Sequence, residues 1–161
     1  MTDGHLLIAW HGRTGTSEAL AASAAEGAAA NGSLLPAADV TPDDLLAAGG
    51  YLFVCPENLA SMSGEMKEMF DRCYYPVLGK LNGRPFATII AAGSDGEGAQ
   101  RQIDRIAKGW RLKRVAEPWI VNTAAQSPEA ILAAKTLEPA TLQTARDMGE
   151  ALGEAVTSGM L

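Results

Sequence analysis

At residues 11–17 the chain reads His11-Gly12-Arg13-Thr14-Gly15-Thr16-Ser17, between a short apolar run (residues 6–10) and an alanine-rich segment. A strand, a loop of small residues and a helix in this order form an anion site, because the free N–H groups at the start of the helix and its macrodipole favour negative charge. The threonine and serine hydroxyls can donate to phosphate oxygens. The same residue types also form ordinary turns and helix N-caps, so the loop alone leaves both interpretations open.

The composition is that of a globular protein: 161 residues, 47% of them hydrophobic and 20% charged. This length predicts a single domain over residues 1–161. No apolar run approaches the ~20 residues that span a bilayer, and the first residues lack the basic segment of a signal peptide. We therefore expect a cytoplasmic protein with no membrane partner. The net charge of −6 argues against nucleic acid as a partner.

The cysteines and histidines do not indicate a metal site. Cys55 and Cys73 form no CxxC motif, and Cys55 ends an apolar run, which is typical of a buried structural thiol. His5 and His11 are too few to build a metal centre on their own. We expect no bound metal.

Apolar runs alternate with amphipathic or alanine-rich segments along the chain. Continuous apolar runs are typical of strands covered on both faces, and a run that ends in proline is typical of an edge strand. The predicted strands cover about residues 5–10, 34–37, 51–55, 85–91 and 119–121, and the predicted helices about residues 16–30, 41–48, 64–74, 98–110 and 139–158.

This alternation predicts an α/β fold, a doubly wound parallel sheet of five strands with helices on both faces. Right-handed crossovers bring the loops after the first, third and fourth strands to the carboxyl edge of the sheet. These loops are residues 11–17, 56–64 and 93–98, and all are rich in Gly, Ser, Thr or Asn. A ligand at the topological switch point would contact all three.

The same three segments resemble the FMN-binding loops of the flavodoxin-like proteins, especially the branch of NAD(P)H-dependent FMN and quinone reductases. They are Trp10 to Glu18, Pro56 to Lys67 and Ala92 to Gln100, and Met62-Ser63-Gly64 is part of the closest match. The resemblance implies a flavodoxin-like fold with strand order 2-1-3-4-5 and an FMN cofactor.

The resemblance also implies how the loops share the cofactor: phosphate on the first, the flavin ring on backbone N–H groups of the second, and an outer wall from the third. The implied cofactor-binding residues are His11, Gly12, Arg13, Thr14, Gly15, Thr16, Ser17, Pro56, Glu57, Asn58, Leu59, Ala60, Ser61, Met62, Gly93, Ser94, Gly96 and Gly98. No residue is assigned a catalytic role, and His11 is expected to be a hydrogen-bonded loop residue rather than a proton donor.

Three positions depart from the family pattern. Gly12 stands where relatives often have Ser or Thr, which removes one phosphate donor, and Asn58 replaces a common aromatic residue. Ala60 stands where many relatives have Gly, and alanine resists a positive φ, which disfavours a redox-linked peptide flip there. Without the aromatic residue, we expect one face of the flavin to be open to a nicotinamide or a quinone.

The chain lacks the residues that other nucleotide-binding or phosphate-accepting domains need. A receiver domain needs acidic residues after the first strand and an Asp after the third, but the chain has His11 and Pro56 there. A P-loop needs Gly-Lys-Ser/Thr, and a dinucleotide fold needs GxGxxG, and neither motif stands in the first loop.

The sequence leaves three functions open. The favoured one is an FMN oxidoreductase that takes hydride from NAD(P)H and reduces a quinone or similar small acceptor. The alternative is a flavodoxin-type one-electron carrier, which the acidic charge favours because basic redox partners would be steered to it. The third is a non-catalytic FMN-binding regulatory module. A homo-oligomer is compatible with each of the three.

Overall fold

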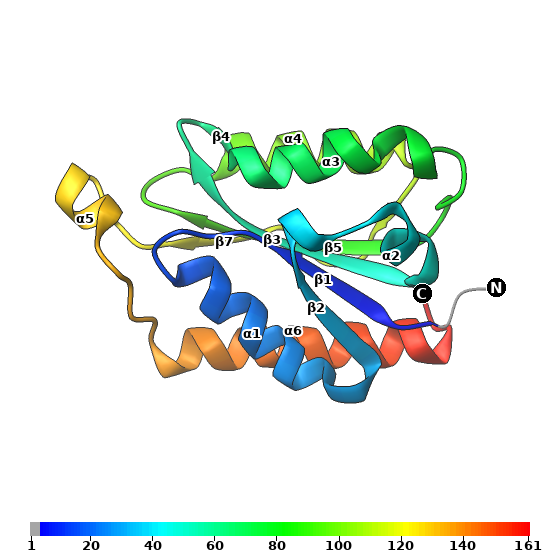
Figure 1. Ribbon diagram of the computed structural model, residues 1–161. Coiled ribbons are helices and arrows are strands. Elements are labelled where there is room, and N and C mark those ends of the chain that lie inside the picture. The colour runs from blue at the N-terminus through cyan, green and yellow to red at the C-terminus, as the bar shows by residue number, and fades with distance from the viewer. Residues whose placement is uncertain (1–3) are drawn as a thin grey trace.

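The apolar runs of the sequence form a central sheet with helices on both faces in the computed structural model, which describes residues 4–161 (Figure 1). The strands are β1 (Leu6–Trp10), β2 (Gly32–Pro36), β3 (Gly50–Asn58), β4 (Ser61–Met62), β5 (Pro85–Ala92), β6 (Lys113–Arg114) and β7 (Trp119–Asn122). The helices are α1 (Thr16–Ala28), α2 (Pro42–Ala47), α3 (Gly64–Val77), α4 (Glu97–Gly109), α5 (Pro128–Leu132) and α6 (Pro139–Ser158), with short 3-10 turns at Ala29–Asn31 and Ala37–Asp39.

The strand order confirms the predicted flavodoxin-like topology. β2, β1, β3 and β5 lie side by side and parallel, and β6 and β7 both pair with β5 along different parts of its length. With β7 as the fifth main strand, the order is the expected 2-1-3-4-5. The antiparallel β4 pairs only with the end of β3 among the described residues.

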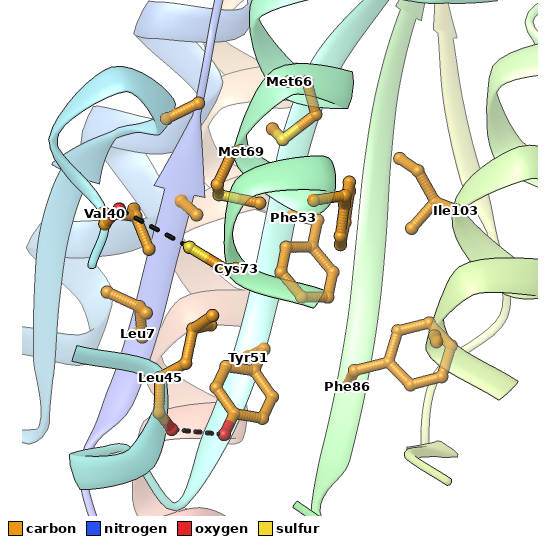
Figure 2. Packing of buried hydrophobic residues seen from close by; sticks show 14 of the residues in the cluster. Leu7, Val40, Leu45, Tyr51, Phe53, Met66, Met69, Cys73, Phe86 and Ile103 are labelled. Atoms are coloured by element: carbon orange, nitrogen blue, oxygen red, sulfur yellow. Dashed lines mark hydrogen bonds between the residues drawn. The ribbon is translucent and has the colours of Figure 1, made fainter. Parts of the chain in front are cut away.

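Side chains of the strands alternate between two hydrophobic layers. On one face, under α3 and α4, Leu7 and Phe53 pack with Met66 and Ile103 (Figure 2). On the other face, Ile8 and Leu52 pack with Leu20 and Leu152. Figure 1 shows α1 and α6 on this side of the sheet, opposite α3 and α4. Because both faces are covered, the central strands β1, β3 and β5 are largely apolar, which explains why they were recognisable in the sequence.

Both cysteines are free and buried, as the sequence predicted for Cys55. Burial raises the pKa of the Cys55 thiol to about 12 and also raises that of Cys73, whose thiol faces the Val40 carbonyl in Figure 2. Neither thiol is therefore ionised near neutral pH, which makes both poor nucleophiles.

The main correction concerns residues 56–64, which the sequence predicted to be a loop. β3 continues to Asn58 and turns back as β4, with Glu57 opposite Met62 and Asn58 opposite Ser61. Pro56 has no N–H, yet it remains within β3, where it is paired with Ala91 of β5. The sequence also did not predict β6 or α5, and it ended α3 at Tyr74 rather than Val77.

Candidate functional site

The loops after β1, β3 and β5 meet at the carboxyl edge of the sheet around a cavity of about 70 Å³. This volume is far below the roughly 300–1,000 Å³ of pockets that enclose a whole drug-sized ligand, so it fits one small group of a larger ligand. The predicted residues that line it are Gly12, Arg13, Thr14, Thr16, Ser17, Pro56, Glu57, Asn58 and Gly93. Those that do not line it are His11, Gly15, Leu59, Ala60, Ser61, Met62, Ser94, Gly96 and Gly98.

Two residues that line the cavity carry buried hydroxyls that have no hydrogen-bond partner within residues 4–161. They belong to Thr16 and Ser17, which are only 5% and 2% exposed at the start of α1. A buried polar atom without a partner costs roughly 1–3 kcal/mol, so such atoms need an explanation. An acceptor from outside the chain, bound in the cavity, would satisfy both.

The start of α1 adds further donors at the same place. Gly15 is its N-cap residue with φ 100°, a left-handed conformation that glycine adopts without steric strain. The first N–H groups of the helix have no partner within the helix, and Thr16 and Ser17, which carry two of them, line the cavity. Two donor hydroxyls, free N–H groups and the positive end of a helix dipole together fit a phosphate group.

The β3–β4 hairpin lies beside the cavity, and its tip has unusual backbone geometry. Leu59 and Ala60 have φ of 53° and 62°, so alanine adopts the conformation it was expected to resist. The hairpin is held there by contacts with α4. The Glu57 carboxylate accepts hydrogen bonds from the N–H groups of Gly96 (2.8 Å) and Ala99 (3.2 Å), at the positive end of that helix.

Several predicted residues build the frame of the site instead of lining the cavity. The Gln102 side chain accepts from Met62 N at 2.8 Å and from the Ser61 hydroxyl at 3.0 Å, which ties β4 to α4. Gly98 packs directly against the Ala60 carbonyl, where a side chain would not fit. Ser94 is exposed, and its carbonyl accepts from Asn122.

His11 connects the first loop to the start of α3. Its Nε2 lies 3.1 Å from the Glu65 carboxylate, which can only accept, so Nε2 carries the proton and the Ser63 hydroxyl donates to Nδ1 at 2.8 Å. Burial lowers the pKa of His11, Glu65 opposes this shift, and Arg13 adds to it. Ser63 is fully buried, so this Ser–His–Glu chain has no nucleophile that a substrate could reach.

Lowering the pH from about 7.5 to about 5.5 is expected to destabilise the protein more than it destabilises a His11→Gln variant. The unfolded chain takes up a proton on His11 near its ordinary pKa of 6.5, while the folded protein does so only at lower pH. Between these two values the unfolded state binds more protons, so stability falls as the pH falls. Urea unfolding of both proteins at the two pH values measures the difference. An identical pH dependence in the two proteins would contradict this role of His11.

The cavity also has walls that the sequence did not predict. They are Ala91, Ala92, Thr123, Ala125, Ile131 and Lys135. Ala91 and Ala92 end β5, and Thr123 and Ala125 follow β7, so their place at the carboxyl edge could have been inferred from the fifth strand. Ile131 and Lys135 belong to the long connection between β7 and α6, and no motif in the sequence marks them.

Residues 35–126, more than half of the chain, match the family model described as NADPH-dependent FMN reductase. The match includes the second and third loops and begins after the first. Comparison with curated proteins finds no significant match. Within residues 4–161, no helix is long and apolar enough to cross a membrane.

The fold is similar to that of solved flavodoxins. A flavodoxin from the domain Archaea matches with a TM-score of 0.76 at 15% identity, over 94% of this chain and 98% of that one. A WrbA-like flavodoxin from Agrobacterium tumefaciens matches with a TM-score of 0.71 at 18% identity, over 96% and 98%. The flavodiiron protein from Giardia intestinalis gives 0.77 at 15% identity, where 98% of this chain covers 37% of that larger protein.

Proposed function

Since the chain belongs to the NADPH-dependent FMN reductase family and is a flavodoxin-like FMN-binding oxidoreductase, we propose that it uses NAD(P)H to reduce a quinone or a similar small acceptor. Bound FMN would supply the group that accepts and donates electrons. The chain's own residues bind that group, orient it and leave one part of it accessible.

The unpartnered hydroxyls of Thr16 and Ser17 support the placement of the FMN phosphate in the cavity. In this arrangement both hydroxyls and the first N–H groups of α1 donate to phosphate oxygens, and Thr14 and Arg13 lie at the same wall. The flavin ring would then lie outside the cavity, toward Pro56–Asn58 and the hairpin tip. Backbone N–H groups there would face its polar edge. Glu57 would hold the hairpin in place through α4 rather than contact the ring.

The observation that carries the reductase proposal is the absence of an aromatic side chain at the flavin-facing loops. Neither residues 57–62 nor residues 93–98 include Phe, Tyr or Trp, and Leu59 at the hairpin tip is fully exposed. A ring held by this hairpin would have no aromatic residue of these loops stacked on it. That leaves room for a nicotinamide to lie against the ring, and later for a quinone.

Anaerobic mixing of the FMN-loaded protein with NADPH is expected to bleach the visible absorbance of the flavin. Subsequent addition of a quinone should restore it. Stopped-flow absorbance measures both steps, with free FMN at the same concentration as the control for uncatalysed reduction. Flavin that stays oxidised for minutes with both NADH and NADPH would contradict the reductase proposal.

A one-electron carrier is the second candidate, and the net charge of −6 favours it. An acidic surface steers basic redox proteins toward the flavin, and this attraction weakens with salt. A protein that is not reduced by nicotinamides, but is reduced by a basic reductase at a rate that falls with ionic strength, would be such a carrier.

A further inference from the structure

The 123–138 connection, between β7 and α6, crosses the carboxyl edge beside the first loop. In Figure 1 its helix α5 stands out from the body of the protein at that edge. Ala125 is buried against Gly93 at one end of the connection. At the other end, the N–H of Lys135 donates to the Thr14 carbonyl at 2.9 Å. The connection is therefore fastened to both sides of the cavity, and its contact with the first loop is made at Lys135.

Lys135 lines the cavity, and its ammonium group contacts only uncharged acceptors within residues 4–161. Its Nζ donates to the carbonyls of Ile131 (2.9 Å) and Ala133 (2.5 Å), and Ile131 itself lines the cavity. An ammonium group has three donors, so a third remains available. No carboxylate of residues 4–161 forms an ion pair with it, and the same holds for Arg13, the other basic residue that lines the cavity.

We propose that Lys135 is a ligand of the FMN phosphate and that the 123–138 connection positions it at this site. This inference rests on the proposed placement of the FMN phosphate between Thr16, Ser17 and the start of α1. Those groups supply hydrogen bonds but only the partial charge of a helix end, while a phosphate monoester is close to a dianion. In a chain with net charge −6, a nearby ammonium offsets the repulsion that the anion would meet.

The proposal makes Lys135 a determinant of specificity for FMN over riboflavin, which has the same ring and no phosphate. Rotation of a few side-chain bonds would move Nζ from the Ile131 carbonyl toward the anion. The backbone contact with Thr14 would stay in place, because it does not involve the side chain. A change of the side chain should therefore act on phosphate binding without releasing the connection.

The test compares dissociation constants for FMN and riboflavin, measured by quenching of flavin fluorescence on the full chain. Lys135→Met is expected to reduce the preference for FMN by about fivefold, as for the loss of one partly exposed charge pair. Lys135→Arg keeps the charge and should keep most of the preference. Lys113→Met removes an exposed lysine at the amino end of β5, on the opposite edge of the sheet, and controls for the change in net charge.

Each possible result of these titrations supports or overturns the role of Lys135 in phosphate binding. An unchanged preference in Lys135→Met, or the same loss in Lys113→Met, would overturn the inference about Lys135. Equal weakening of FMN and riboflavin in Lys135→Met would give the residue a structural role only, and would overturn it as well. A wild-type protein that binds riboflavin as tightly as FMN would overturn the phosphate site itself, and the role of Lys135 with it.

Discussion

Replacing Ser17 by alanine is expected to weaken FMN binding by about one to two decades and to leave riboflavin binding nearly unchanged. The Ser17 hydroxyl is buried, Ser17 lines the cavity, and the hydroxyl has no partner within residues 4–161, so its hydrogen bond is available to the phosphate. A hydrogen bond to a charged group contributes ~1.5–3 kcal/mol, which corresponds to roughly 10- to 100-fold in affinity. Thr16→Val, which keeps the shape and removes the hydroxyl, should have an effect of the same size.

Although Ser17→Ala should lower the affinity for FMN, it should not lower the stability of the protein without FMN. Removal of a buried hydroxyl that has no partner removes its desolvation cost, so Ser17→Ala should unfold at the same or a slightly higher urea concentration than the wild type. Loss of affinity together with unchanged or increased stability separates a ligand-binding role from a structural one.

Ser23→Ala is the matched control, because Ser23 is buried in the same helix and does not line the cavity. Its FMN preference should equal that of the wild type. If Ser17→Ala weakened FMN and riboflavin equally, or left both unchanged, the phosphate would lie elsewhere. Titrations followed by flavin fluorescence, with both ligands and all three variants, distinguish these results.

The fold was largely predictable because its determinants are local. Strands buried on both faces must be apolar along their whole length, as in Leu52 and Phe53 or Ile89 and Ile90, and such runs are visible without knowledge of their neighbours. The order of loops at one edge then followed from the handedness of parallel crossovers. For the same reason the first loop could be placed at the carboxyl edge of the sheet before any geometry was known.

The shape of the candidate site was less predictable because it depends on contacts between distant segments. Leu59 and Ala60 disfavour positive φ on their own, and the hairpin forms because Glu57 and Gln102 bind it to α4. In the same way, Lys135 reaches the cavity through a hydrogen bond to Thr14, more than a hundred residues earlier. No local pattern encodes either contact.

Two kinds of predicted residue can now be distinguished by what their loss should do. Thr16 and Ser17 face the cavity, so their substitution should act on the phosphate alone. Glu57 and Gly98 hold the hairpin on α4, so their substitution should move the loop that would support the ring. The comparison of FMN with riboflavin separates the two groups, because the two ligands share the ring and differ only in the phosphate.

Gly98→Ala is therefore expected to weaken FMN and riboflavin together, by about tenfold each, and to destabilise the fold by ~1–3 kcal/mol. An added Cβ at Gly98 would overlap the Ala60 carbonyl oxygen and lie 3.1 Å from a Glu57 carboxylate oxygen. The first of these atoms is backbone, so the hairpin must shift as a unit, which displaces the N–H groups proposed to face the flavin. Urea unfolding and titrations with both ligands measure the two effects.

Gly64→Ala is the control, since Gly64 also starts a helix but has no atom within 4 Å of its added Cβ, and it should be neutral in both assays. Weakening confined to FMN in Gly98→Ala would contradict this arrangement, because the hairpin would then act on the phosphate and not on the ring.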